Sequence, residues 1–159
     1  MATPPVLLCI HRHPERLSVL QENGYELLVA ETGCEGLGVF GAHVVDAVVL
    51  EFNLGLVDGS VVAAEIKQVM PDMPIVMLAE PEELPAGALQ AVDALVPRSD
   101  PPHFLWAAVH FALNVRRGMN VRTGSMPIQV AGRTSKSRRS SRRPKTDSSR
   151  TALYNEQLA

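Results

Sequence analysis

The sequence predicts an α/β protein with a doubly wound sheet of five parallel strands, followed by a basic C-terminal tail. Five short apolar runs alternate with segments of helical character along the first 117 of the 159 residues. This alternation is typical of βαβ units joined by right-handed crossovers. The runs are nearly continuous in Val, Leu and Ile, as expected for parallel strands covered by helices on both faces.

The predicted strands come first in each unit and the helices follow them. Pro14 opens the first predicted helix and Asn23-Gly24 ends it, because glycine commonly stops a helix. The second helix begins near Cys34 and contains three glycines that weaken it. The predicted strands are residues 6–10, 26–30, 47–50, 75–78 and 94–96.

The three later helices differ in strength. The stretch SVVAAEIKQVM predicts a helix that ends before Pro71, whereas residues 85–91 predict only a short, weak helix. Residues 102 to about 117 predict a long apolar helix, HFLWAAVHFALNVRR. One stripe at helical spacing, Phe104, Ala108, Phe111 and Val115, is expected to face the core. A neighbouring stripe is expected to form a surface for a partner or a homodimer, together with Leu95; it comprises Trp106, Val109 and Leu113.

Charge divides the chain into two parts. Residues 1–117 carry 6 basic and 15 acidic side chains, whereas residues 118–159 carry 9 basic and 2 acidic ones. The second part is rich in Arg, Lys and Ser and poor in apolar residues, so we predict a folded domain over 1–117 and a disordered tail over 118–159. Clustered basic side chains attract phosphates and other polyanions non-specifically. The predicted polyanion contacts are Arg138, Arg139, Arg142, Arg143 and Lys145.

Several classes of protein are excluded by composition. No apolar run approaches the ~20 residues that a membrane-spanning helix needs, and the N-terminus lacks the features of a signal peptide. The two cysteines have no metal-binding or redox spacing, so we expect a cytoplasmic protein without a disulfide. The sequence also lacks a phosphate-binding glycine loop, a nucleophile elbow and a carboxylate cluster, which argues against an enzyme on this sheet.

Residues directly after the predicted strands are the candidates for a functional site. In open parallel sheets, sites form at the carboxyl ends of the strands near the switch point of the topology. An acid, Glu51, follows the third strand, and Arg98 follows the fifth. The remaining candidates are His11, Arg12 and His13 after the first strand, and Ala79 and Glu80 after the fourth.

Five segments together resemble the receiver domain of bacterial response regulators over about residues 5–117. They are VLLCIHRHPERL, GYELLVAETGCEGL, DAVVLEFNLGLVDG, PDMPIVMLAE and VDALVPRSDPP. The resemblance implies a flavodoxin-like fold with the strand order 2-1-3-4-5. It also implies a role in two-component or phosphorelay signalling.

The residues that carry the chemistry of that family are replaced. Where a receiver has its phosphoacceptor aspartate, this chain has Glu51. The acidic pair that holds Mg²⁺ corresponds to His11 and Arg12. The hydroxyl residue after strand four corresponds to Ala79, and the lysine after strand five to Arg98. Two further departures are Ser99, where a proline is usual, and Leu95, where the switching aromatic aligns.

These replacements argue against phosphotransfer. Mg²⁺ prefers oxygen ligands, and a guanidinium in place of a carboxylate repels it. Phosphoryl transfer depends on such cations to stabilise negative charge. Glu51 also places its carboxylate one methylene further out, and misplacement by ~1 Å can cost ~10²-fold in rate. We therefore expect no catalytic residue, no cofactor and no resident metal.

Three roles for Glu51 remain open from sequence. It can mimic a phosphorylated aspartate permanently, it can pair with Arg12 and Arg98, or it can contact only water at the strand end. Arginine suits the second role because its planar fork binds carboxylates bidentately. His11 and His13 lack a third metal ligand nearby and are expected to face solvent in a loop.

The function predicted from sequence is that of a stand-alone, degenerate receiver module. It would act by phosphorylation-independent contacts with a signalling kinase or an output protein. The alternative is an accessory protein that binds nucleic acid or another anion weakly through the basic tail.

Overall fold

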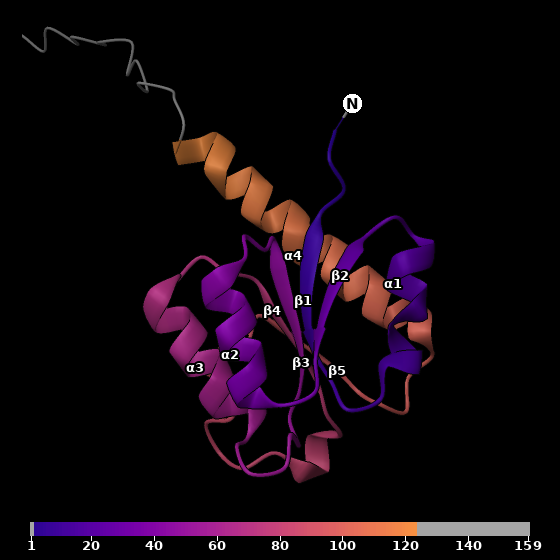
Figure 1. Ribbon diagram of the computed structural model, residues 1–159, viewed down its shortest axis with the longest axis vertical. Coiled ribbons are helices and arrows are strands. Elements are labelled where there is room, and N and C mark those ends of the chain that lie inside the picture. The colour runs from indigo at the N-terminus through magenta and orange to yellow at the C-terminus, as the bar shows by residue number, and fades with distance from the viewer. Residues whose placement is uncertain (1, 124–159) are drawn as a thin grey trace, which may run out of the picture. The chain divides into compact units, whose positions relative to one another are not determined.

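The computed structural model describes residues 2–123, which form a parallel five-stranded sheet between two helical layers (Figure 1). The strand order is β2-β1-β3-β4-β5, and every neighbouring pair is parallel. The predicted flavodoxin-like class and strand order are therefore confirmed. The strands are β1 (Val6–Ile10), β2 (Glu26–Ala30), β3 (Ala47–Glu51), β4 (Ile75–Leu78) and β5 (Ala94–Val96).

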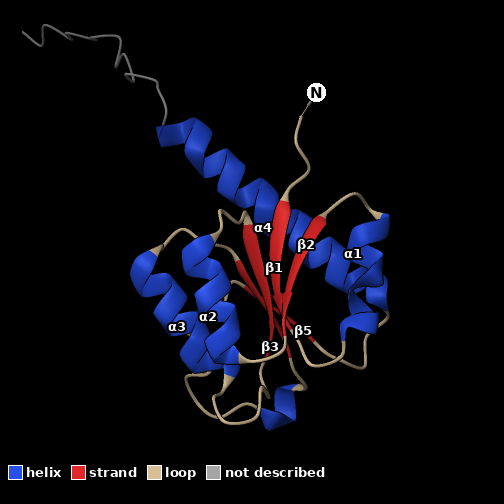
Figure 2. Ribbon diagram, viewed as in Figure 1, coloured by secondary structure: helices blue, strands red, loops and turns tan. Residues whose placement is uncertain are grey.

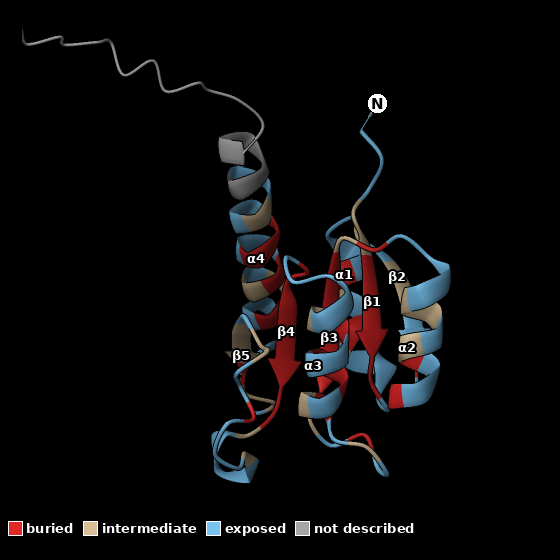
Figure 3. Cartoon of the chain, turned by 90° about the vertical axis from the view of Figure 1, so that its left-hand side faces the viewer, coloured by how far each residue is buried: buried red, intermediate tan, exposed pale blue. Residues whose placement is uncertain are grey.

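Helices cover both faces of the sheet, with α2 and α3 on one face and α1 and α4 on the other (Figure 2). Side chains alternate along each strand, so Leu8 and Ile10 pack under α2 and α3, whereas Leu7 and Cys9 pack under α1 and α4. The central strands β1, β3 and β4 are almost completely buried, whereas the edge strands β2 and β5 are only partly buried, and the helices expose their outer faces (Figure 3). The helical elements are η1 (Pro14–Leu17), α1 (Ser18–Glu22), α2 (Gly33–Ala42), α3 (Gly59–Val69), η2 (Pro81–Glu83) and α4 (Pro102–Thr123).

The register brings the carboxyl ends of β1, β3, β4 and β5 into line. Ile10 of β1 lies beside Leu50 of β3, and Glu51 lies beside Leu78 of β4. Leu78 in turn lies beside Val96 of β5. The residues that follow these strands therefore meet at one edge of the sheet, which we call the carboxyl edge.

Asp58-Gly59 connects this edge to α3. The amide of Gly59 donates to the carbonyl oxygen of Phe52 at 2.7 Å, which closes the loop after β3. A Cβ at position 59 would overlap with the carbonyl oxygen of Glu51, so only glycine fits this close approach. The dipeptide serves the architecture that holds Glu51 in place.

The opposite edge, which we call the amino edge, is also closed by acids. The carboxylate of Asp46, just before β3, accepts from the amide of Val6 at 2.8 Å. The carboxylate of Asp93, just before β5, accepts from the amide of Ile75 at 2.8 Å and pairs with Lys67 at 2.8 Å. Each acid thereby satisfies a backbone donor at the start of a neighbouring strand.

Two predicted helices differ from the structure. Residues 85–91 form turns and not a helix, since Pro81 and Pro85 restrict the backbone and Gly87 adopts a φ of 84°. The last helix extends to Thr123, six residues beyond the predicted end, because a single glycine at position 118 only weakens a helix.

The two apolar stripes of α4 are largely the reverse of the prediction. Val109 and Leu113 are buried with Leu105 against β-strand side chains, so they cannot offer a partner surface in this structure. Trp106 and Leu95 are half-buried. Three of the four residues expected in the core are exposed instead, at 48% for Phe104, 69% for Phe111 and 39% for Val115. Ala108, the fourth, is partly buried and packs against the core as predicted. Both stripes have helical spacing, so periodicity could not decide which one faces the sheet.

The predicted tail, with its basic residues at 138–145, lies outside the described residues. The domain boundary at 117 therefore stays a prediction. Within residues 2–123, none of the helices combines the length and the apolar character required to cross a membrane.

Candidate functional site

Glu51 is the last residue of β3 and lies buried at the carboxyl edge, with 4% of its surface exposed. Its Oε1 accepts a hydrogen bond from a guanidinium nitrogen of Arg98 at 2.9 Å. The predicted contact between these two residues is therefore present. An acid in contact only with water is ruled out by this burial.

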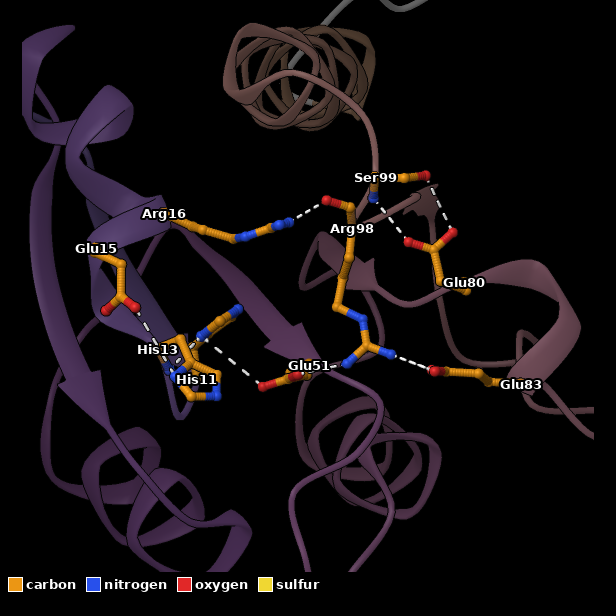
Figure 4. A network of polar contacts seen from close by, with 9 residues as sticks. All are labelled: His11, His13, Glu15, Arg16, Glu51, Glu80, Glu83, Arg98 and Ser99. Atoms are coloured by element: carbon orange, nitrogen blue, oxygen red, sulfur yellow. Dashed lines mark hydrogen bonds and ion pairs between the residues drawn. The ribbon is translucent and has the colours of Figure 1, made fainter.

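Arg98 lies two residues after β5 and bridges two carboxylates (Figure 4). One guanidinium nitrogen binds Glu51, and another binds the exposed carboxylate of Glu83 in η2. The carbonyl oxygen of Arg98 accepts from the side chain of Arg16 in η1. Arg98 thus links the buried end of β3 to two surface segments.

His11 follows β1 directly and is buried, with only 1% of its surface exposed. The expectation that it faces solvent was wrong, whereas His13 is exposed as predicted. Strand alternation explains the burial. Leu7 and Cys9 point toward α1 and α4, and the backbone amide of His11 continues the β1–β2 ladder by donating to Ala30 at 2.9 Å. Its side chain follows the same alternation, as does that of Glu51 on β3.

The His11 ring has one satisfied and one unsatisfied nitrogen. Its Nδ1 accepts the backbone amide of His13 at 2.7 Å, so this nitrogen carries no proton and the neutral ring is protonated on Nε2. Nε2 is buried without a partner, and so is Oε2 of Glu51. Nδ1 and Oε2 lie 3.8 Å apart, which is too long for a hydrogen bond.

Burial lowers the pKa of His11 below its ordinary value of 6.5. The carboxylate of Glu51 opposes this effect on the pKa, while His13 and Arg16 add to it. Glu15 also favours the charged form and so raises the pKa. The ring is therefore neutral at neutral pH, because desolvation disfavours the imidazolium.

Arg12 does not take part in the network. Its side chain is exposed, and its guanidinium lies beside Gly55 in the loop after β3. The proposed pairing of Glu51 with both arginines was therefore half wrong, since only Arg98 contacts it. The backbone alternation that turns His11 inward turns the next side chain outward.

Residues after β4 complete the edge. Ala79 is fully buried and offers no hydroxyl, as its side chain dictates. Glu80 accepts from the backbone amide of Ser99 at 2.7 Å and from its hydroxyl at 3.2 Å. The contacts of Glu80 and Glu83 were not predicted. The acidic run after β4 could have predicted these contacts, because the sheet places it opposite Arg98 and Ser99.

The residues present do not fit a magnesium ion. At the positions where a receiver has its metal-binding acids and its phosphoacceptor, His11 offers a neutral imidazole and Arg12 an exposed guanidinium. The carboxylate of Glu51 is already bound to Arg98. Mg²⁺ requires near-octahedral oxygen ligation and repels a guanidinium. Among residues 2–123, no group of three or more His, Cys, Asp or Glu side chains is arranged to hold a metal.

The fold and the site together define a class. An all-parallel sheet in the order 2-1-3-4-5, with an acid at the end of its central strand, is a flavodoxin-like α/β domain whose site lies at the topological switch point.

Comparison with known proteins narrows this class. No protein-family model matches the chain. The transcriptional regulatory protein GlrR of Escherichia coli is 31% identical over 117 residues, covering 69% of this chain and 26% of GlrR. The chain thus spans about a quarter of the length of the curated relatives it matches. The response regulator TrrA of Thermotoga maritima, solved in complex with Mg²⁺-BeF, is 29% identical, with a TM-score of 0.62 over 68% of this chain and 98% of that structure.

A receiver domain from Clostridium thermocellum shares the fold at 22% identity, with a TM-score of 0.65 over 72% of this chain and 98% of that structure. The curated relatives and the structural neighbours are thus response regulators and their receiver domains. The chain therefore has the fold of a response-regulator receiver (CheY-like) domain and is similar to these proteins in sequence.

Proposed function

We propose that this receiver domain acts in two-component signalling through protein contacts that do not depend on phosphorylation. The observation that carries the proposal is the state of Glu51, which is buried and already bound by Arg98. A phosphoryl group would have to displace that guanidinium with no metal-binding acids beside it. Phosphoryl transfer without positioned cations loses most of its transition-state stabilisation.

The test is incubation of the full chain with a small phosphodonor and Mg²⁺, with a receiver that retains all its acidic residues as the positive control. We expect no acyl phosphate on this chain by intact-mass measurement. Stoichiometric phosphorylation that disappears in Glu51→Gln would overturn the proposal.

We also propose that the protein acts in the cytoplasm. Among residues 2–123, both Cys9 and Cys34 are free thiols, as expected in a reducing compartment.

A protein partner, such as a signalling kinase or an output protein, would carry the signal onward. We place its contact on the exposed stripe of α4 formed by Phe104, Phe111 and Val115. Phe111→Ser should abolish capture of that partner from the cells of origin. Val44→Ser is the control: Val44 is 91% exposed but lies outside the stripe, so this variant should still capture the partner. A homodimer on the same stripe would show instead as a mass that halves in Phe111→Ser.

A permanently phosphomimetic Glu51 is the alternative within the same family. This alternative requires neighbouring groups that respond to the negative charge of Glu51. However, Arg98 neutralises that charge, and Ala79 has no hydroxyl that could bind the carboxylate. Under this alternative, partner capture would be lost in Glu51→Gln even where the variant remains folded. Under the proposed function, folded Glu51→Gln keeps its partner.

A further inference from the structure

The buried His11–Glu51 contact contains two polar atoms that have no partner. Oε2 of Glu51 has no donor, and Nε2 of His11 has no acceptor. Buried polar groups are nearly always hydrogen-bonded, so such a pair at one site requires an explanation. Only the Nδ1 side of the ring has a partner, and that partner is a backbone amide on an exposed loop.

The Nδ1 atom can serve only one of its two neighbours at a time. An imidazole nitrogen either accepts through its single in-plane lone pair or carries a proton and donates. In the neutral ring it accepts from the amide of His13 at 2.7 Å. In the imidazolium it can no longer accept, and the facing group is the unpartnered Oε2 of Glu51 at 3.8 Å.

We propose that His11 is a proton-operated switch at the carboxyl edge, whose Nδ1 exchanges the His13 amide for the Glu51 carboxylate when the ring is protonated. Protonation satisfies Oε2 through a charged hydrogen bond and leaves the His13 amide to bond water. Charge-assisted hydrogen bonds of this kind are shorter and stronger than neutral ones. Closing the 3.8 Å gap needs a movement of about 1 Å.

The released amide belongs to a segment that is connected to the rest of the site. His13 precedes η1 and makes no side-chain cap there. Arg16 of η1 binds the carbonyl oxygen of Arg98, whose guanidinium holds Glu51. Loosening of residues 13–16 is therefore transmitted to the loop after β5, and acid alters a surface formed by two separate segments.

The charged groups around the ring set the range of the switch. Glu51 of β3 and Glu15 of η1 favour the imidazolium, whereas His13 and Arg16 disfavour it. Arg98 faces the same Glu51 and neutralises part of its charge. Burial opposes the charged form more than any of these, so the pKa of His11 lies below the ordinary histidine value and switching occurs on acidification.

The test is a pH titration of the full chain by NMR, using ¹⁵N-labelled protein. At neutral pH we expect a through-hydrogen-bond coupling between the His13 amide nitrogen and His11 Nδ1. Below the ordinary histidine value of ~6.5, we expect the Nδ1 resonance to become that of a protonated nitrogen. The coupling and the exchange protection of the His13 amide should be lost at the same midpoint.

Three variants separate the switch from simpler causes. His13→Gln keeps the backbone amide and removes the second ring, so the transition should persist. His11→Asn supplies an acceptor that does not titrate, so the amide should stay protected throughout. Glu51→Gln should lower the midpoint because the imidazolium loses its carboxylate. Protonation of His11 with no change at the His13 amide, or a chain that unfolds before His11 titrates, would overturn the proposal.

Discussion

The two edges of the sheet treat their acids differently. At the amino edge, Asp46 and Asp93 are at least partly exposed, and each accepts from a backbone amide of a neighbouring strand. At the carboxyl edge, Glu51 is buried, with one oxygen bound to Arg98 and the other without a partner. The same residue chemistry therefore serves two purposes within one sheet.

This difference separates scaffold from site. The amino edge satisfies its polar groups and holds strand ends, as expected where stability is the only requirement. The carboxyl edge leaves a buried oxygen and a buried nitrogen unsatisfied, which costs stability that packing elsewhere must supply. Departures from local satisfaction of this kind concentrate at functional sites. We therefore expect substitutions at the two edges to change the free energy of unfolding by different amounts.

The largest effect should come from Arg98→Met, which leaves Glu51 buried without its donor. We expect the free energy of unfolding to fall by about 3–5 kcal/mol, because removing one partner strands a buried charge. Urea unfolding monitored by circular dichroism measures it. Arg12→Met, at an exposed arginine outside the network, should change stability by less than ~0.5 kcal/mol.

The double variant sharpens the same comparison. Glu51→Gln combined with Arg98→Met should lose less than the sum of the single losses, since the two side chains interact directly. Strictly additive losses would show that the ion pair contributes nothing to stability.

A smaller effect is expected at the amino edge from Asp46→Ala. The amide of Val6 then loses its acceptor, with a cost of ~1–2 kcal/mol for a partly buried donor. Asp46→Asn keeps an acceptor oxygen and should recover most of this loss in the same urea experiment. Equal destabilisation by both variants would indicate that charge, and not the hydrogen bond, matters at this position.

The third effect depends on pH and belongs to His11. Its folded-state pKa is lowered, so below ~6.5 the unfolded chain binds more protons than the folded one. Its contribution is fully present above that value and declines as the pH falls toward the folded-state pKa. The slope for one proton is at most about 1.4 kcal/mol per pH unit.

Urea midpoints at pH 7.5 and pH 5.5 test this expectation. The native chain should lose more stability between the two values than His11→Asn does. Identical losses in the two proteins would assign the pH dependence to other groups.

The smallest effect should come from Glu83→Gln. Its carboxylate is the exposed partner of Arg98, and exposed ion pairs contribute ~0–1 kcal/mol. Glu51 keeps its donor in this variant, so unfolding should change little. A loss as large as that of Arg98→Met would mean that Glu83, and not Glu51, holds the arginine in place.

The sheet was predictable because its signal is repeated. Five apolar runs with short connections leave few topologies, and the resemblance to receivers selected the order 2-1-3-4-5. The contact of Arg98 with Glu51 was also predictable, since Glu51 lies at the end of β3, Arg98 follows β5, and both strands end at the same edge. The end of β3 was misplaced by one residue, because a charged side chain ended the apolar run.

What the sequence could not decide depended on orientation. His11 lies in a polar stretch, HRH, and only extension of the β1 alternation by one residue places it inside and Arg12 outside. The helix α4 is apolar on more than one side, so the buried stripe is selected by contact with the sheet. Residues 85–91 have helix-forming alanines, but the two prolines and Gly87 determine the local backbone.

The short strand β5, which follows turns and not a helix, has a consequence for how the domain opens locally. β5 is an edge strand of three residues, paired only with β4. Local opening begins where few contacts oppose it, so the amides of β5 should exchange with solvent by fluctuations that leave β1 and β3 closed. Arg98, two residues beyond β5, is bound to the end of the central strand and thereby ties this edge strand to the centre of the sheet.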